Sequence, residues 1–325
     1  MEKIFIHCNL PMSVKKKLKK KFRIKVHNAD KEILSPEIFL KCASGFNGII
    51  SQGNIINREF IEKNKSSLKV ISNVGVGYDN VDLKTASKYG IAVFNTPGIL
   101  NNTVADMTLG LLLALTRKIC EGNNYVKDKK WLGNSWPLFW GCDLNGESLG
   151  IVGMGSIGKE IAKRANSFGL KIFYNNRKKL NKEIEEEFNA NYLSLNKLVE
   201  KCKFIILLLP LNNESKHLFN KSIFKRMRKD AYIVNIARGK IIKEIDLVNA
   251  LIDNDIAGAA LDVFEFEPKV NKKLFKLKNV VLMPHAGSAT LNTRNKMINM
   301  ACENISDYLL LKKSNNIVNK EVLNV

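Results

Sequence analysis

The chain of 325 residues has no long apolar run. Its longest apolar stretch, FIILLLPL at 204–211, has the length of a buried strand rather than that of a membrane-spanning helix. The N-terminal MEKIFIHCNL also lacks the extended apolar core of a secretory signal. We therefore expect no membrane span and no signal peptide.

Disulfide and metal-binding patterns are missing as well. The six cysteines are scattered without a CxxC pair, and the four histidines do not cluster. This spacing argues against a disulfide framework and suggests neither a zinc site nor another metal site. Free cysteines of this kind are typical of a reducing compartment, so we predict a cytoplasmic protein.

Acidic residues are in deficit, with 31 Asp and Glu against 52 Lys and Arg, which gives a formal net charge of +21. The densest basic segment, KKKLKKKFRIK at 15–25, has eight basic residues in eleven. A nucleic-acid partner is one interpretation, and a steep salt dependence of DNA affinity would reveal it. No aromatic-interleaved basic patch, zinc finger or RNP-like motif accompanies the lysines. We interpret the segment as a solvated helix face and expect neither a nucleic-acid nor a membrane partner.

Short β-rich runs alternate with helical stretches along the whole chain. The runs lack a clean polar–apolar alternation, as parallel strands buried on both faces do. Strand–helix alternation of this kind predicts an α/β fold with two doubly wound parallel sheets. The expected strands form two series, the first at 3–7, 24–27, 46–51, 69–74 and 91–94, and the second at 148–152, 171–175, 204–209, 231–236, 257–262 and 279–283.

Two helical segments set the expected domain boundaries. The apolar helix at 101–119 lies between the two strand series and suits an interdomain spine. The helix at 291–311 has no strand after it, so it must pack on a domain that already exists, and we expect it to return to the first. The predicted domains are a discontinuous substrate domain, 1–100 plus 288–325, and a dinucleotide-binding domain, 101–287.

A glycine-rich loop follows the first strand of the second series. The pattern GxGxxG alone is weak evidence, but here it ends an apolar strand and opens a helix, which is the context of a dinucleotide fingerprint. Three glycines would allow the tight turn, the approach of a pyrophosphate and close helix–strand packing, while the helix N-terminus attracts the phosphates. The alternative is a mere strand–helix turn. The predicted cofactor-binding residues are Gly153, Met154, Gly155, Ser156, Ile157 and Gly158.

The next strand should end in Asp or Glu if it bound the ribose 2′-hydroxyl of NAD. It ends instead in Asn175 and Asn176, followed by Arg177 and two lysines. No carboxylate there repels a 2′-phosphate, and the cations could attract one, so Asn176 and Arg177 favour NADP(H), with NAD(H) possible. The alternative is a charged loop with the acid supplied from elsewhere.

Three late strands each end in a polar group of a different kind. Arg238 follows the strand AYIVNI, Glu265 and Glu267 follow ALDVF, and His285 follows VVLMP. Ligands of a doubly wound sheet lie outside the carboxyl ends of its strands. An arginine that binds a carboxylate, a histidine that donates a proton and a glutamate that holds the imidazole suit reduction of a 2-oxo acid. The alternative interpretations are an interdomain salt bridge for Arg238, a solvated loop acid for Glu267 and a structural role for His285.

Six stretches together resemble the D-isomer-specific 2-hydroxyacid dehydrogenase family over nearly the whole chain, and most closely its glyoxylate/hydroxypyruvate reductase branch. The resemblance implies a Rossmann domain inserted into a flavodoxin-like substrate domain. The matching stretches are NVGVGYDNVD (73–82), NTPGILNNTVADMTLGLLLAL (95–115), GIVGMGSIGKEIAKR (150–164), VNIARG (234–239), LDVFEFEP (261–268) and PHAGSAT (284–290).

The resemblance also implies roles for single residues. It makes Arg238, Glu267 and His285 catalytic, with Glu267 rather than Glu265 as the partner of the histidine. Its substrate-binding residues are Val74, Gly75, Arg238 and His285. The remaining cofactor-binding residues are Thr103, Pro210, Ala237, Asp262 and Gly287.

Departures from the family's pattern are few. The usual Ala-Glu of the spine helix is Ala105-Asp106 here. The stretch WLGNSWPLFWGCDL (131–144) resembles a tryptophan-rich segment in which an aromatic of the partner subunit closes the active site, which implies a homodimer. The alignment does not decide between Trp136 and Trp140. A Glu rather than a Gln beside the histidine speaks against formate oxidation.

The expected activity is therefore reduction of glyoxylate and/or hydroxypyruvate to the 2-hydroxy acid, with hydride from NADPH and His285 as the general acid. Other members of the family, of the D-lactate or 3-phosphoglycerate type, are the nearest alternatives. A nucleotide-sensing corepressor that binds protein peptides is an alternative of a different class.

Overall fold

The structure is a computed structural model that describes residues 1–27, 34–133, 136 and 138–324. The chain divides into two compact units, one formed by 1–100 with 289–325 and the other by 101–288. Each unit is built on its own parallel sheet, so the predicted α/β class is confirmed. None of the helices in the described ranges is both long enough and apolar enough to cross a membrane.

The sheet of the first unit has the strand order β2-β1-β3-β4-β5, the flavodoxin-like order. Neighbouring strands are parallel, and their registers run in step, for example Phe5 opposite Ile49. The strands are β1 (Lys3–His7), β2 (Arg23–His27), β3 (Gly48–Ser51), β4 (Val70–Asn73) and β5 (Ala92–Phe94).

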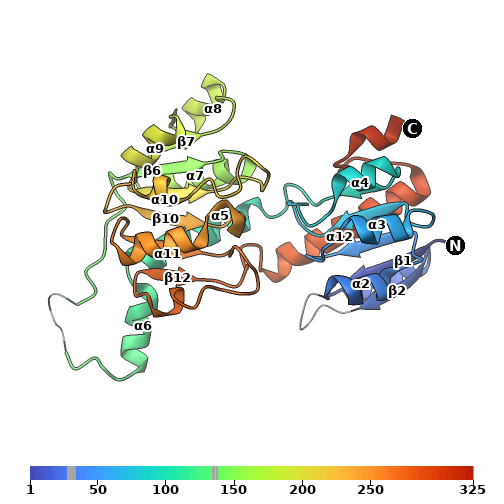
Figure 1. The fold of residues 1–325 in the computed structure, drawn as a ribbon, viewed down its shortest axis with the longest axis horizontal. Coiled ribbons are helices and arrows are strands. Elements are labelled where there is room, and N and C mark those ends of the chain that lie inside the picture. The colour runs from blue at the N-terminus through green and yellow to red at the C-terminus, as the bar shows by residue number, and fades with distance from the viewer. Residues whose placement is uncertain (28–33, 134–135, 137, 325) are drawn as a thin grey trace. The chain divides into compact units, whose positions relative to one another are not determined.

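Both faces of this sheet are covered by helices (Figure 1). One face packs on α2 (Pro36–Ala43), α3 (Arg58–Asn64) and α4 (Leu83–Lys88), around a core that includes Phe5, Phe39 and Phe60. The long helix α12 (Leu291–Leu311) packs against β3 and β4 and contacts α1 (Met12–Lys19). The chain thus returns to the first sheet after the second unit. The lysines at 15–17 and 19 lie on α1, where Leu18 is the buried residue.

The second sheet has the order β12-β11-β10-β9-β6-β7-β8, which is the Rossmann order, extended by one strand. The direction of the strand order reverses between β6 and β9, and the carboxyl ends beside that point are where such folds bind nucleotides. The strands are β6 (Ser148–Val152), β7 (Lys171–Asn175), β8 (Ala190–Tyr192), β9 (Phe204–Leu207), β10 (Tyr232–Asn235), β11 (Gly258–Leu261) and β12 (Val280–Leu282).

Helices also cover this second sheet. On one face α9 (Leu195–Lys201), α10 (Lys221–Phe224) and α11 (Glu244–Ile252) share a core with the strands. The spine helix α5 (Asn101–Thr116) packs on α7 (Ser156–Ser167) and on β10, β11 and β12. The short helix α8 (Lys182–Glu187) precedes β8, and single 3₁₀ turns lie at Gly239–Ile241, Leu274–Lys276 and, in the first unit, Lys320–Asn324.

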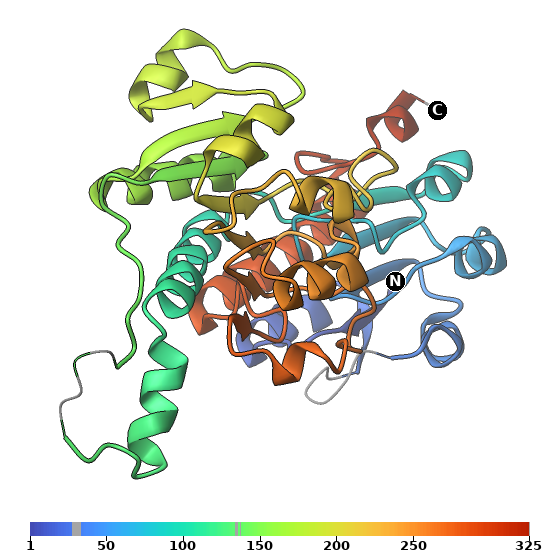
Figure 2. The same cartoon turned by 60° about the vertical axis from the view of Figure 1, so that its left-hand side comes forward.

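Two elements depart from the sequence-based expectations. The strand β8 was not expected, because its three residues carry only one buried side chain, Ala190, and form no apolar run. The spine helix was expected to reach 119, but it ends at Thr116, and a separate helix, α6 (Ile119–Lys127), begins after a left-handed Lys118. In both views α6 projects from the sheet of its own unit (Figures 1 and 2).

Candidate active site

The glycine loop between β6 and α7 has the geometry that each of its glycines requires. Gly153 has a φ of +103°, and a Cβ there would lie 3.0 Å from the backbone of Leu208. A Cβ on Gly158 would lie 3.0 Å from the Gly153 carbonyl oxygen, so this glycine permits the close packing of helix on strand. A Cβ on Gly155 would meet no atom within 4 Å, which leaves space above the loop for a ligand.

The N-terminus of α7 has free donors at this loop. Gly155 is the N-cap and supplies no side chain to the first turn, so the N–H groups of Ser156, Ile157 and Gly158 have no acceptor among the described residues. Met154, by contrast, is buried, and its N–H donates to Asn176 Oδ1 at 2.7 Å. The first turn thus offers N–H groups and the positive end of a helix dipole to an anion, which fits the pyrophosphate of a dinucleotide.

The loop after β7 is fixed at both of its ends. At the start, the Asn176 amide accepts from Met154 N and donates back to Met154 O at 3.3 Å. At the end, Leu180 N donates to the Tyr174 hydroxyl, which in turn donates to Glu185. Between these anchors, Arg177 is 82% exposed, and its Nη1 lies 4.0 Å from the exposed carboxylate of Glu214. A cation on a preformed loop therefore faces solvent close to the glycine loop.

The other predicted cofactor residues all lie at helix starts or strand ends of the second unit. Thr103 is in the first turn of α5, Pro210 follows β9 and accepts from Ser215 through its carbonyl, and Ala237 follows β10. Asp262 comes directly after β11, and Gly287 follows β12.

Asp262 organises the segment that carries His285. Its side chain is buried and accepts from Ala286 N at 2.7 Å and from Gly287 N at 2.8 Å, while its carbonyl accepts from His285 N at 2.8 Å. Burial raises the pKa of Asp262 and outweighs the opposing effect of the two N–H donors. Three successive amides therefore converge on one residue, which fixes the backbone of the histidine loop.

Glu267 and His285 form a direct pair. Glu267 Oε2 lies 2.8 Å from His285 Nδ1, and Glu267 Oε1 accepts from Phe264 N at 2.9 Å. Burial opposes ionisation of Glu267, but the hydrogen bond and charge of His285, together with Phe264 N and Arg238, hold its pKa below the usual range. The His285 side chain is 50% exposed, and its Nε2 has no hydrogen bond to any described residue. That nitrogen is therefore available for a hydrogen bond to a ligand.

Arg238 is presented by a shaped turn at the end of β10. The buried side chain of Asn235 accepts from Ala237 N and donates to Arg238 O, which closes the turn, and Arg238 Nη1 donates to Ala237 O at 2.7 Å. The next residue, Gly239, lies so close to the peptide between Phe264 and Glu265 that any Cβ would overlap it. The arginine turn is therefore packed directly against the glutamate loop.

The two amides expected to bind a substrate carboxylate have acceptors within the first unit. Val74 N donates to Ser51 O at 2.9 Å, and Gly75 N donates to Asn73 O at 3.0 Å. The next two amides, those of Val76 and Gly77, have no acceptor in the described ranges. Their carbonyls are instead held by side chains, that of Val76 by Asn95 and that of Gly77 by Asn73.

Asp106, which replaces the family's usual glutamate, has a defined contact. Its Oδ1 accepts from Arg164 Nε at 2.7 Å, and Arg164 also bonds Glu160 on its own helix and Asn102 on α5. The shorter aspartate thus still joins α5 to α7. No group of three or more potential metal ligands occurs among the residues that the structure describes.

The three tryptophans of the stretch at 131–144 are exposed in this chain. Trp136 is 88% exposed and Trp140 is 64% exposed, and Trp140 Nε1 donates to the Trp136 carbonyl. Residues 134, 135 and 137 of the stretch lie outside the described residues.

Comparison with known proteins agrees with this geometry. The profile described as D-isomer specific 2-hydroxyacid dehydrogenase, NAD binding domain, matches residues 109–287. The chain is 39% identical to a glyoxylate reductase of Pyrococcus horikoshii over 328 residues, which cover 99% of this chain and 97% of the relative. The chain therefore belongs to the D-isomer-specific 2-hydroxyacid dehydrogenase family, and it is an oxidoreductase of that type.

Solved structures point to the same branch. A glyoxylate reductase from Paecilomyes thermophila superposes with a TM-score of 0.88 at 30% identity and covers 98% of this chain and 99% of its own. An NADPH-dependent glyoxylate/hydroxypyruvate reductase from Sinorhizobium meliloti superposes with a TM-score of 0.84 at 29% identity and covers 99% of both chains. The predicted resemblance is thus confirmed at the level of family and branch.

Proposed function

We propose that this protein reduces glyoxylate and/or hydroxypyruvate to the corresponding 2-hydroxy acid with NADPH. The observation that carries this proposal is the pairing of His285 with Glu267 beside the turn of Arg238. A proton donor, its anionic partner and a fork of cationic donors are the groups that reduction of a 2-oxo acid needs. The names of the similar reductases support the small substrate.

The chain's own residues do three things in this reaction. Arg238 binds the substrate carboxylate and orients the keto group, because a guanidinium offers paired donors to a carboxylate. His285 Nε2 donates a proton to the oxygen of the former keto group. Glu267 stabilises the imidazolium that holds this proton and fixes the ring through Nδ1. A bound nicotinamide supplies the hydride.

The preference for NADPH is proposed from the loop after β7. Asn176 is neutral and already bonded to the glycine loop, so it presents no carboxylate to a 2′-phosphate. Arg177 is exposed and has only a loose ion pair with Glu214, so it can turn toward that phosphate. The family match establishes an NAD-binding domain, and a structural relative is NADPH-dependent.

The first unit contributes backbone donors to substrate binding. Because the amides of Val74 and Gly75 already donate within the unit, we assign the carboxylate contacts to Val76 and Gly77. Side-chain bonds to both carbonyls hold these two peptides in place, so they are prepared to bind an anion without reorganising.

A homodimer through α6 and the exposed apolar residues that follow it completes the proposal. None of the described residues of α6 is buried, and exposed apolar side chains continue after it at Trp131, Leu132 (96% exposed), Trp136 and Trp140. A run of large exposed apolar residues is typical of a protein interface. A second copy of the chain is the partner that the family resemblance implies.

The test is a comparison of initial rates with NADPH and NADH against glyoxylate, hydroxypyruvate, pyruvate and 3-phosphohydroxypyruvate. We expect the highest kcat/KM with glyoxylate or hydroxypyruvate and NADPH. A clear preference for pyruvate or the phosphorylated acid would contradict the proposed substrate and indicate another activity of the family. Absence of turnover with all four, together with tight NADPH binding, would favour a nucleotide-sensing protein.

A further inference from the structure

The loop between β11 and Pro268 carries two glutamates, and each pairs with a different histidine. Glu267 pairs with His285, while Glu265 Oε1 lies 2.6 Å from His217 Nε2. The two glutamates are separated only by Phe266, which is 62% exposed. The second pair lies apart from the proposed proton transfer and is still mostly shielded from solvent, since the Glu265 side chain is only 10% exposed.

Both oxygens of the Glu265 carboxylate have donors. Oε1 faces His217, and Oε2 accepts from Glu244 N, the first residue of α11, at 2.9 Å. In return, Glu265 N donates to Glu244 Oε2 at 3.1 Å. Two glutamates thus cap each other's backbone, and the loop is joined to a helix start at two points.

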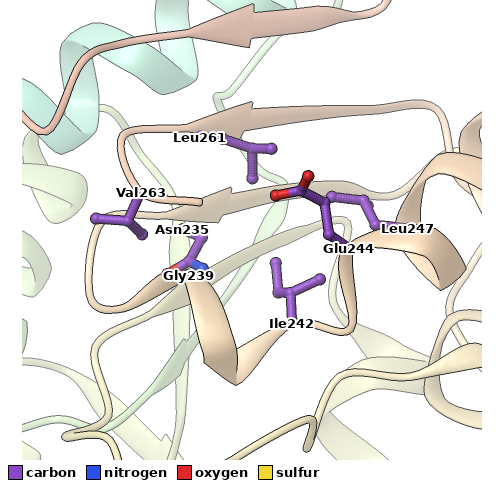
Figure 3. Close-up of a pocket in the computed structure, with 7 residues that line it drawn as sticks. All are labelled: Asn235, Gly239, Ile242, Glu244, Leu247, Leu261 and Val263. Atoms are coloured by element: carbon purple, nitrogen blue, oxygen red, sulfur yellow. The ribbon is translucent and has the colours of Figure 1, made fainter. Parts of the chain in front are cut away.

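Glu244 extends this network below the loop. It is buried, and its Oε1 accepts from Asn271 N at 3.0 Å, beyond the proline that follows Glu267. Figure 3 shows its side chain directed into a small cavity that is also lined by Asn235, Gly239 and Leu261. The cavity has space for at most about one water molecule, so the network has almost no room to shift.

His217 ties the same network to the turn of Arg238. Its backbone N donates to Lys240 O at 2.8 Å, and Phe219 N donates to Ile241 O, so the two segments run side by side just after the arginine. Gly239 closes the arrangement by its contact with the peptide that precedes Glu265. The arginine turn, the glutamate loop and the start of α11 are therefore held as one piece.

We propose that Glu265, held by His217 and Glu244, is a positioning residue for the reaction. Glu265 does not touch the groups that would react. It fixes the backbone of the loop in which Phe264 N donates to the Glu267 carboxylate, and that carboxylate in turn positions His285 through Nδ1. This assignment rests on the proposed roles of Glu267 and His285. Loss of the anchor lets the general acid move, which lowers kcat, while NADPH binding at the glycine loop is unaffected.

The experiment compares Glu265→Ala, Glu265→Gln and a matched control, Asn279→Ala, in the full-length protein. Asn279 makes a half-buried bond to Ala257 O at the amino ends of the same strands, so its loss tests stability without touching the loop. We expect kcat of Glu265→Ala to fall on the order of tenfold or more, because displacements of about 1 Å in an active site have effects of that size. The KM for NADPH should stay near the parent value.

The conservative variant should largely restore kcat. The Gln amide oxygen can accept from Glu244 N, while its NH₂ group can donate to the other tautomer of His217. The control should lower the melting temperature and leave kcat unchanged. An unchanged kcat in Glu265→Ala, or an equal fall in the control, would overturn the proposal.

If Glu265→Ala does not fold, His217→Ala provides the same test, because it removes one donor and leaves both backbone bonds between Glu265 and Glu244 intact. Its kcat should fall and that of His217→Gln should not, since the Gln amide can replace Nε2 as the donor. Equal kcat values in the two variants would refute the positioning role. A parent enzyme without turnover of any 2-oxo acid would instead refute the proposed function.

Discussion

At the scale of single residues, the roles proposed for Glu267 and His285 make reduction depend on pH. The imidazole must hold a proton to donate it, so reduction fades as pH rises through the range in which that proton is lost. Burial opposes ionisation of Glu267, but its hydrogen bond to His285 and the charge of that ring hold the pKa of Glu267 below its usual range. The carboxylate therefore stays ionised to low pH and can serve as the anionic partner in the proposed reaction.

Glu267→Gln tests this coupling directly. The amide can keep the ring in place but carries no charge, so the alkaline limb of kcat/KM for reduction should move to lower pH, as expected for loss of an adjacent opposite charge. The same profile in His285→Ala should be low throughout, by roughly 10²–10⁴-fold, because the general acid is missing. A fall in activity of Glu267→Gln with an unmoved limb would mean that Glu267 only orients the ring.

At the scale of elements, the loop between β7 and α8 is the proposed selector of the cofactor. Asn176→Asp keeps an acceptor for Met154 N but adds a charge that repels a 2′-phosphate and can bind a 2′-hydroxyl, so the variant should favour NADH. Arg177→Ala should mainly weaken NADPH, by about 1.5–3 kcal/mol for a lost charge-assisted contact, or roughly ten- to a hundredfold. Dissociation constants for both cofactors measure these shifts.

Lys201→Ala provides the control for general charge effects. Lys201 lies at the end of α9 with its ammonium over the Phe173 ring, outside the loop after β7. Its loss removes the same charge as Arg177→Ala and should change the two affinities little and in parallel. Unchanged NADPH/NADH ratios in both loop variants would show that selection lies elsewhere.

Sequence patterns predict the helices and strands that have strong periodicity, but not the features that are fixed by long-range contacts. The buried strands and the spine helix are readable because their apolar residues are continuous or periodic. The edge strand β8 has one buried residue, so its pairing with β7 leaves no trace in local sequence. The bond of Glu265 to His217 spans 48 residues, and the occupied amide of Val74 depends on Ser51 from another strand. Such partners follow only from the assembled sheets.

At the scale of the whole molecule, the proposed dimer determines whether one active site includes a side chain of the partner subunit. In the single chain, the Trp136 indole is almost fully exposed and has no hydrogen bond to a described residue, whereas the Trp140 indole braces the segment by donating to the Trp136 carbonyl. This difference favours Trp136 as the side chain that reaches a partner subunit.

We expect light scattering to give a mass about twice the chain's 36.7 kDa. Leu132→Asp, which places a charge on the most exposed apolar residue of the segment, should shift that mass toward one chain.

Mixed dimers test whether a tryptophan serves the partner's site. Trp136→Ala should retain the dimer mass and lose kcat/KM, and His285→Ala should be almost inactive by itself. When the two variants are dissociated and re-paired in equal amounts, each mixed dimer contains one site with both His285 and the partner's tryptophan. Random pairing makes about half of the dimers mixed, so roughly a quarter of the parent's sites should regain activity. If activity does not rise above the average of the two unmixed variants, Trp136 acts within its own chain or not at all. The same exchange with Trp140→Ala in place of Trp136→Ala then decides whether the other tryptophan has that role.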